Sequence, residues 1–408
     1  MTPPHCRSCD APLQTLVVDL GLSPLANAYV TPEHTNEGET FFPLRVYVCD
    51  VCLLVQLEAF ETREKIFSEY AYLSSYSEAW LAHAAAYVDA TARRLRLDRD
   101  SLVVEVASND GYLLRYFVER GVPVLGVEPA ANVAGIAIER GIRSEVVFFG
   151  EQTARELRSR HGAADLIVAN NVLAHVPNLH DFVAGFAVLL ADGGSISVEF
   201  PHVLRLLEEN QFDTIYHEHF CYYSLHALEP VFARHGLCIV DVEHLPTHGG
   251  SLRLWLRHQA GVSPQRSVED LREEERRAGL HERATYLAYA PKVHTVKRDL
   301  LEFLIRAARD GKRVAAYGAP AKGNTLLNYC GVRGDMVAFT VDRNPLKQGS
   351  LLPGTRIPVF APDRLRAERP DYVLILPWNV KDEIVEQMRD VRTWGGRFVV
   401  AIPRLSVE

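Results

Sequence analysis

The sequence predicts an α/β protein of three parts, in which a small metal-stabilised module precedes two domains built on parallel sheets. Two Cys-x-x-Cys pairs lie near the N-terminus, and two later stretches of chain alternate short apolar runs with helical segments. Between those stretches, residues 262–310 are rich in Glu, Arg and Ala with helical periodicity, which indicates a helical connector. At 408 residues the chain is too long for one ordinary core, so two or three domains are expected.

The two cysteine pairs predict a structural zinc site in the first part, residues 1–70. Residues 16–18 and 44–48 resemble short strands, but the polar stretch 31–40 between them leaves little core, so a metal would supply the missing stability. Four thiolates leave no open position for a catalytic zinc. The alternative of a redox dithiol is weaker because neither pair opens a helix after a strand. The predicted ligands are Cys6, Cys9, Cys49 and Cys52.

The composition, with 48% apolar and 24% charged residues, is that of a soluble globular protein. Residues 1–5 lack the apolar segment of a signal peptide, and no run of 18 apolar residues predicts a membrane span. We therefore expect a cytoplasmic protein whose reduced thiols favour zinc over disulfides. The net charge of −8 argues against nucleic-acid binding, which needs a basic footprint. A zinc-ribbon protein that binds nucleic acid is nevertheless the alternative from another class.

The second and third parts, residues 71–260 and 261–408, each alternate strand and helix patterns, which predicts parallel sheets with helical crossovers. The second part opens with an expected helix at residues 75–98. Its expected strands lie at residues 102–106, 124–127, 164–169 and 195–200, and those of the third part at residues 313–318, 337–342, 372–376 and 397–401. The chain therefore carries two doubly wound domains behind the zinc module.

The turn after the first of these strands, residues 105–111, predicts a site for an adenosyl cofactor. Small residues in a strand–turn–helix segment let backbone amides approach a ligand, and an acid at the end of the next strand can accept both ribose hydroxyls. The turn lacks a full G-x-G-x-x-G, so one adenosyl ligand without a pyrophosphate fits better than a dinucleotide. A plain βαβ unit without a ligand is the alternative. The predicted cofactor residues are Glu105, Ala107, Asn109, Gly111, Glu128, Asn170 and Asn171.

Four consecutive side chains that titrate or form hydrogen bonds, Tyr216, His217, Glu218 and His219, form a candidate reactive cluster. Neighbouring side chains point in different directions, so one metal ion is not expected to bind all three acidic or imidazole groups. A neutral imidazole has a pKa suited to a general base. We expect His217 to be a bystander.

Residues 317–325 again follow a strand and open a helix, which together with Lys322 predicts a phosphate site without the Walker spacing. Trp378 follows a later strand and is expected to line the same cleft. Arg253, after the glycine pair of residues 249–250, is a second candidate phosphate contact, with a surface ion pair as its alternative.

Taken in order, these motifs resemble those of the three-domain sugar C-methyltransferases that act on nucleotide-linked 4-keto deoxysugars in antibiotic biosynthesis. The resemblance covers the whole chain and is carried by the paired cysteines and by residues 70–75, 105–111, 175–177, 216–220, 248–251 and 317–323. It implies a zinc-binding module, a central Rossmann-like class I S-adenosylmethionine (SAM) methyltransferase domain and a second Rossmann-like α/β domain that helps to bind the nucleotide-sugar.

The resemblance also implies a reaction. The chain would be a SAM-dependent enzyme that methylates the carbon next to the ketone, C3, of a thymidine-linked keto-deoxysugar after a base forms the enolate. The implied catalytic residues are His219 as base, Tyr216, Glu218, His175 and Tyr70, and the implied substrate-binding residues are Lys322, Arg253, His248 and Trp378. An O- or N-methyltransferase that acts on another small molecule is the alternative. Three domains could enclose the site without a partner subunit, so we expect a monomer.

Overall fold

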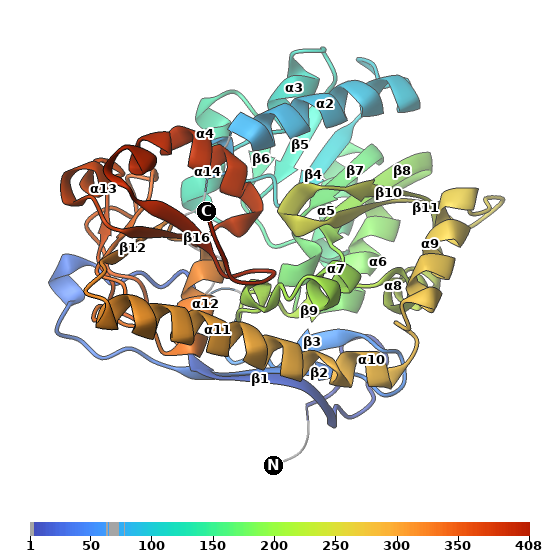
Figure 1. Cartoon of the computed structure of the whole chain (residues 1–408). Coiled ribbons are helices and arrows are strands. Elements are labelled where there is room, and N and C mark those ends of the chain that lie inside the picture. The colour runs from blue at the N-terminus through green and yellow to red at the C-terminus, as the bar shows by residue number, and fades with distance from the viewer. Residues whose placement is uncertain (1–3, 63, 65–72, 77) are drawn as a thin grey trace.

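The structure is a computed structural model that describes residues 4–62, 64, 73–76 and 78–408 (Figure 1). Its described strands form three sheets of four, seven and six strands. The sheets correspond to the zinc module, the central domain and the C-terminal domain, and the three parts surround a common centre.

The zinc module is built on an antiparallel sheet that the central domain completes. Its own strands are β1 (Thr15–Ser23), β2 (Phe42–Val48) and β3 (Val55–Leu57), with a short 3₁₀ turn η1 (Pro32–His34) between the first two. The fourth strand, β9 (Cys221–Tyr222), follows the reactive cluster in sequence and pairs with β3. The module therefore shares its hydrogen-bonded framework with the segment that carries the predicted catalytic residues.

The central domain has the predicted parallel sheet and an antiparallel extension. The parallel strands are β4 (Val103–Val106), β5 (Val124–Val127), β6 (Ser144–Glu145), β7 (Ala164–Asn170) and β8 (Leu190–Pro201), in the order β8-β7-β4-β5-β6. A hairpin of β10 (Leu237–Leu245) and β11 (Ser251–His258) adds two antiparallel strands beside β8. The sequence analysis did not predict this hairpin. Because its strands are antiparallel to their neighbours, the sheet is mixed.

Helices cover both faces of this sheet because successive strand residues point to opposite sides. Val103 packs against α2 (Glu78–Leu95) and α3 (Leu114–Val118), whereas Val104 packs with α5 (Glu151–His161), α6 (Leu179–Leu189) and α8 (Leu225–Arg234). The remaining short elements are η2 (Ser74–Tyr76), α4 (Ala131–Glu139), η3 (Leu173–His175), α7 (Val203–Glu208), η4 (Phe212–Thr214) and η5 (Thr247–Gly249).

The predicted connector consists of the helices α9 (Arg266–Arg277), α10 (Arg283–Leu287) and α11 (Tyr289–Arg309). The C-terminal sheet then has the order β14-β13-β12-β15-β16-β17. Its strands are β12 (Val314–Tyr317), β13 (Thr340–Val341), β14 (Val359–Phe360), β15 (Tyr372–Ile375), β16 (Arg397–Val400) and the antiparallel β17 (Ser406–Val407). Its helices are α12 (Ala321–Cys330), α13 (Asp363–Glu368), η6 (Trp378–Val380), α14 (Lys381–Gln387) and η7 (Arg389–Trp394).

Helix α11 joins the zinc module to the C-terminal domain in one hydrophobic core. Its buried residues Val293, Val296, Leu300 and Leu304 recur every three or four positions and so share one face of the helix. They belong to the same cluster as Val17 of β1 and residues of α12, and α11 runs along β1 in Figure 1. The module is therefore packed against the C-terminal domain as well as paired with the central one.

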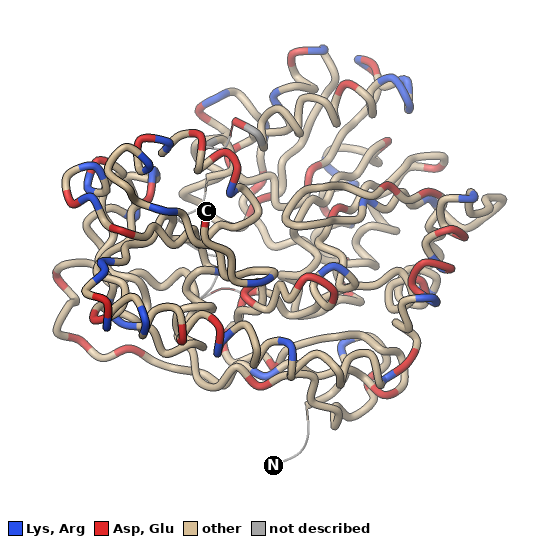
Figure 2. Tube along the Cα trace, viewed as in Figure 1, with Lys and Arg blue, Asp and Glu red and all other residues tan. Residues whose placement is uncertain are grey.

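Charged residues are distributed over the outer helices. In the view of Figure 2, acidic and basic residues are interspersed along them and do not gather into one basic band. Within the described ranges, no helix combines the length and apolar character needed to cross a membrane.

The turn after β12 gives a test of the packing between the C-terminal strands. Gly318 has φ +91°, and a Cβ at this position would lie 2.5 Å from Pro377 Cδ. Gly331, the C-cap of α12, has φ +72° but open space around it. We predict that Gly318→Ala lowers the free energy of unfolding by about 2–3 kcal/mol in urea denaturation. Gly331→Ala is the matched control and costs about 1 kcal/mol from backbone strain alone. Equal effects would contradict the predicted clash.

Candidate active site

One cavity of about 440 Å³ lies between the three parts of the chain. Its size is within the range of small-molecule sites. Residues at the carboxyl ends of β4, β5, β7 and β8 line one side, at the position where open α/β sheets bind ligands. The zinc module contributes Asn27 and Tyr29 to the wall, and the C-terminal domain contributes Pro320 and several residues that follow it in sequence.

The predicted cofactor turn after β4 has an unusual backbone. Ala107, Asn109 and Gly111 all have positive φ, at 59°, 50° and 76°. A Cβ on Gly111 would lie 2.9 Å from Ile142 Cγ1, so the tight turn requires glycine there. Ala107 and Asn109 line the cavity, whereas Gly111 shapes the turn from outside it.

Glu128, at the end of β5, lines the cavity and is held by backbone amides. Its Oε2 accepts from Asn109 N at 3.0 Å and its Oε1 accepts from Ala130 N at 2.9 Å. Burial raises the pKa of this carboxyl. Each carboxylate oxygen has a second lone pair, so Glu128 can also accept from the two hydroxyls of a ribose.

Several buried polar atoms at this end of the cavity have no hydrogen-bond partner among the described residues. They are Oδ1 of Asn170, and Oδ1 and Nδ2 of Asn171. Asn170 and Asn171 line the cavity, whereas Glu105 lies behind it, and burial raises its pKa well above the usual value. Buried polar atoms are normally paired, so this set fits a ligand with amino, carboxyl and hydroxyl groups such as an adenosyl amino acid.

Tyr216 and His219 form a hydrogen-bonded pair whose donors can be assigned. His219 Nδ1 lies 2.8 Å from the carbonyl oxygen of Thr214, which can only accept, so the Nδ1–H donates. Nε2 of the neutral ring therefore carries the lone pair. The hydroxyl of Tyr216 lies 2.7 Å from Nε2 and donates to it. Both side chains line the cavity, so the pair presents a base to a bound molecule.

His175 packs edge-on against His219, with 4.7 Å between the ring centroids. Burial lowers the pKa of His175 to about 4. Burial also lowers the pKa of His219 well below its usual value, and the nearby His175 contributes to that effect. Both imidazoles therefore stay neutral near pH 7, which is the form a base requires.

The other two members of the reactive cluster turn away from the cavity. Asn27 Nδ2 donates to both carboxyl oxygens of Glu218, at 2.8 and 2.9 Å, and Glu218 is not part of the cavity wall. Burial raises the pKa of Glu218 to about 7. His217 Nε2 donates to the carbonyl of Pro43 at 3.1 Å and lies against the zinc module. Tyr70, the remaining predicted catalytic residue, lies outside the described residues.

Lys322 lines the cavity at the start of α12, as the predicted phosphate site requires. Its Nζ donates to Asn379 Oδ1 at 2.7 Å and lies 4.8 Å from the centre of the Trp378 ring. Trp378 does not reach the cavity wall, and its indole N–H donates to Asp213 Oδ2 at 2.7 Å. Trp378 therefore supports the lysine from behind.

Lys347 is a second cavity-lining lysine that the sequence analysis missed. Its Nζ donates to the carbonyl of Ala319 at 2.8 Å, and the nearest carboxyl oxygen, on Asp342, is 4.0 Å away. Burial lowers the pKa of both lysines. Lys347 lies in a loop without periodicity, so no sequence signal pointed to it. Two buried ammonium groups bonded to neutral acceptors favour an anionic ligand at this end of the cavity.

His248 and Arg253, two further predicted substrate residues, have different surroundings. His248 lines the cavity with a left-handed backbone, φ +53°, and burial lowers its pKa to about 4. Arg253 lies outside the cavity wall and forms ion pairs with Glu199 at 2.7 Å and Glu243 at 3.1 Å. The structure thus has Arg253 in the ion-pair arrangement that the sequence analysis gave as the alternative, although the pair with Glu199 is buried.

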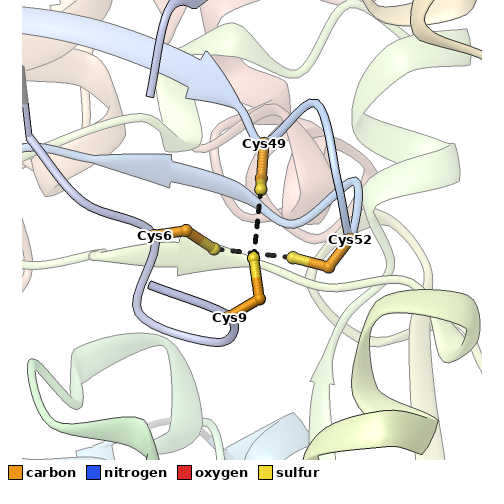
Figure 3. Close-up of side chains that lie close together, drawn as sticks. All are labelled: Cys6, Cys9, Cys49 and Cys52. Carbon is orange, nitrogen blue, oxygen red and sulfur yellow. Dashed lines mark hydrogen bonds between the residues drawn. The ribbon is translucent and has the colours of Figure 1, made fainter. Parts of the chain in front are cut away.

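The four predicted zinc ligands converge on one point (Figure 3). Their sulfur atoms all lie within 4.8 Å of one another, with Cys6 and Cys52 at 3.5 Å and Cys9 and Cys49 at 3.4 Å. Two sulfurs also accept N–H groups, Cys6 from the Gln56 side chain at 3.1 Å and Cys49 from Val51 N at 3.4 Å. Four converging sulfurs with such donors fit a tetrahedral zinc ion.

Three family descriptions match the chain in succession. Residues 6–67 match a putative zinc binding domain, residues 79–242 a methyltransferase domain, and residues 246–403 a C-methyltransferase C-terminal domain. The chain is also 39% identical over 404 residues to C-methyltransferase NovU of Streptomyces niveus, covering 99% of this chain and 96% of that protein.

Two solved structures match part of the chain. A SAM-dependent methyltransferase from Anabaena variabilis matches 43% of this chain and 84% of its own, with 16% identity and a TM-score of 0.35. A magnesium protoporphyrin IX methyltransferase from Synechocystis with bound SAM matches 47% of this chain and 88% of its own, with 14% identity and a TM-score of 0.33.

The cysteine cluster gives a prediction about metal content. We predict that Cys49→Ser abolishes stoichiometric zinc and lowers the melting temperature by about 5 °C or more, because the free energy of metal binding contributes to folding. Metal analysis of the purified protein and a thermal melt measure both effects. Cys238→Ser, which changes a half-buried cysteine outside the cluster, is the control and retains zinc. Full zinc content in the Cys49 variant would contradict the assignment.

Proposed function

The chain belongs to the C-methyltransferase family, and on that premise we propose that it methylates the carbon next to the ketone of a nucleotide-diphosphate-linked 4-keto-deoxysugar. The proposed acceptor is thymidine-linked, and the proposed carbon is C3. The observation that carries this proposal is the Tyr216–His219 pair, in which a neutral imidazole with an assigned lone pair faces the cavity. Formation of an enolate needs such a base to remove a proton from carbon, whereas methylation of oxygen or nitrogen removes no proton from carbon.

His219 Nε2 is the proposed final holder of the proton taken from the carbon. It receives that proton directly, or Tyr216 takes it while passing its own hydroxyl proton to Nε2. The Thr214 carbonyl keeps its hydrogen bond with Nδ1–H throughout and so stabilises the imidazolium. SAM, when bound, supplies an electrophilic methyl group. Burial is proposed to keep His219 neutral until the enolate forms beside it, with the neutral ring of His175 packed against it.

Residues at the two ends of the cavity support the proposed ligands. Glu128, with Asn109 and the amides around it, is proposed to bind the ribose of the cofactor, and Asn170 and Asn171 its other polar groups. Lys322 and Lys347 are proposed to bind the diphosphate of the nucleotide-sugar, because both ammonium groups donate to neutral acceptors and the nearest carboxyl oxygen to Lys347, on Asp342, is 4.0 Å away. The acceptor would then extend from the C-terminal domain toward His219.

Exchange of the acceptor proton with solvent tests this proposal. The protein is incubated in heavy water with S-adenosylhomocysteine and a thymidine-diphosphate-linked 4-keto-6-deoxysugar, and NMR follows both carbons that flank the ketone, C3 and C5. We predict exchange at C3 that slows by about 10²–10⁴-fold in His219→Ala. If the phenol of Tyr216 relays the proton, Tyr216→Phe slows exchange at C3 by the same factor as His219→Ala.

Each other outcome of the exchange experiment is informative. Exchange at C5 instead of C3 would change the position and keep the reaction class. Absence of exchange with confirmed cofactor binding would contradict the keto-sugar proposal and favour methylation of oxygen or nitrogen in another acceptor.

The pKa of His219 gives a prediction about pH. Because burial lowers this pKa well below 6.5, the neutral base persists as the pH falls. At saturating acceptor, the exchange rate should therefore stay near its plateau from pH 8 through 6.5 and decline only at lower pH. A decline at or above pH 6.5 that persists in Glu218→Gln would contradict the prediction. A decline that disappears in Glu218→Gln instead reports the ionisation of Glu218, because burial raises the pKa of that carboxyl group to about 7.

A further inference from the structure

Asn27 of the zinc module lies between Glu218 and the cavity. Asn27 belongs to the cavity wall and Glu218 does not, although the two side chains are joined by hydrogen bonds of 2.8 and 2.9 Å. The buried carboxyl group of Glu218 therefore faces the Nδ2 end of the amide, in a residue that also lines the cavity. Among the described residues, no hydrogen bond to the Asn27 side-chain oxygen, Oδ1, accompanies these two.

The carboxylate determines which end of the amide faces the cavity. Above its raised pKa of about 7, the carboxyl group of Glu218 is ionised and only accepts hydrogen bonds, so the Nδ2 amino group of Asn27, 2.8 and 2.9 Å from its two oxygens, is the end that faces Glu218. The carbonyl oxygen Oδ1 is then the atom left for the cavity. Without Glu218, the two ends of the amide would be interchangeable by rotation about the last side-chain bond.

The backbone around Asn27 is held in place by the C-terminal domain. The carbonyl of the preceding residue, Ala26, accepts from Asn324 Nδ2 of α12 at 2.7 Å. The Tyr29 hydroxyl donates to the carbonyl of Ala319, and Val30 pairs with Leu351 through hydrogen bonds of 3.0 and 2.8 Å. This segment is thus fixed by the C-terminal domain before a ligand binds, which lowers the entropic cost of recognition.

We propose that Asn27 Oδ1 accepts a hydrogen bond from a hydroxyl group of the acceptor sugar, and that Glu218 is the positioning residue that holds the amide in this orientation. The inference rests on the proposed function, because it takes a hydroxylated keto-sugar as the acceptor. It assigns a specificity-determining residue to the zinc module, which would otherwise only stabilise the fold. It also gives Glu218 a role through Asn27, since its carboxyl group does not reach the cavity wall.

The test compares acceptors that differ by one hydroxyl. We measure kcat and KM of the full-length holoenzyme for thymidine-diphosphate-linked 4-keto-6-deoxyglucose and for its analogues that lack the C2 or the C3 hydroxyl. Asn27→Leu should lower kcat/KM for the fully hydroxylated acceptor by about tenfold, mainly through KM. For one of the two deoxy analogues, wild type and variant should be equal, because the hydroxyl that Asn27 binds is missing.

Controls separate recognition from folding. Asn36→Leu makes the same change at an exposed position of the same module and should leave all three acceptors unaffected. Glu218→Gln frees the amide to rotate and should raise KM for the hydroxylated acceptor, again without effect on the same deoxy analogue. Binding of S-adenosylhomocysteine, measured by calorimetry, should be the same in wild type and the variants.

The possible failures can be told apart. An equal loss in Asn27→Leu for all three acceptors, or no loss for any, would overturn the role of Asn27 while methylation of the keto-sugar by the wild type still supports the proposed function. If the wild type neither methylates any of the three acceptors nor exchanges their protons, the proposed function fails, and this inference fails with it.

Discussion

The hydrogen bond from His219 Nδ1–H to the Thr214 carbonyl is the interaction on which the proposed chemistry of the site depends. It fixes the tautomer, and so places the lone pair on Nε2, where the Tyr216 hydroxyl and the cavity are. Burial then keeps the ring neutral. A lone imidazolium would be costly here, whereas one that forms beside an enolate is paired with a negative charge. In the proposed reaction, burial therefore disfavours protonation of His219 by solvent, but tolerates it when the proton comes from the acceptor carbon and leaves an enolate beside the ring.

The cavity that buries this pair exists only because three parts of the chain converge. β9, next to the reactive cluster, completes the sheet of the zinc module, and α11 packs that module against the C-terminal domain. A segment of the module then reaches the cavity through Asn27 and Tyr29. The structural zinc, held by cysteines at the ends of short strands, thus stabilises a part of the protein that contributes to the wall of the active site.

Local pattern predicted much of the fold and part of the site. The parallel strands of both α/β domains, the connector helices and the converging cysteines are confirmed, because each depends on periodicity or spacing within a short stretch of sequence. The cavity also includes His219, Glu128 and Lys322, which short motifs had indicated. The strand β9 was missed because it is short and pairs with the distant strand β3, and the β10–β11 hairpin, whose strands are neighbours in sequence, was missed as well.

The sequence by itself determined which chemical groups are present and which turns present them: a four-thiolate set, a tight turn after β4, and a Tyr-x-x-His pair. Only the tertiary structure decided which groups face the cavity. It turned Glu218 toward Asn27, paired Arg253 with Glu199, and brought Lys347 beside the cavity. The physical reason is that a polar group's role depends on its burial and on its partners, and residues far apart in the chain supply both.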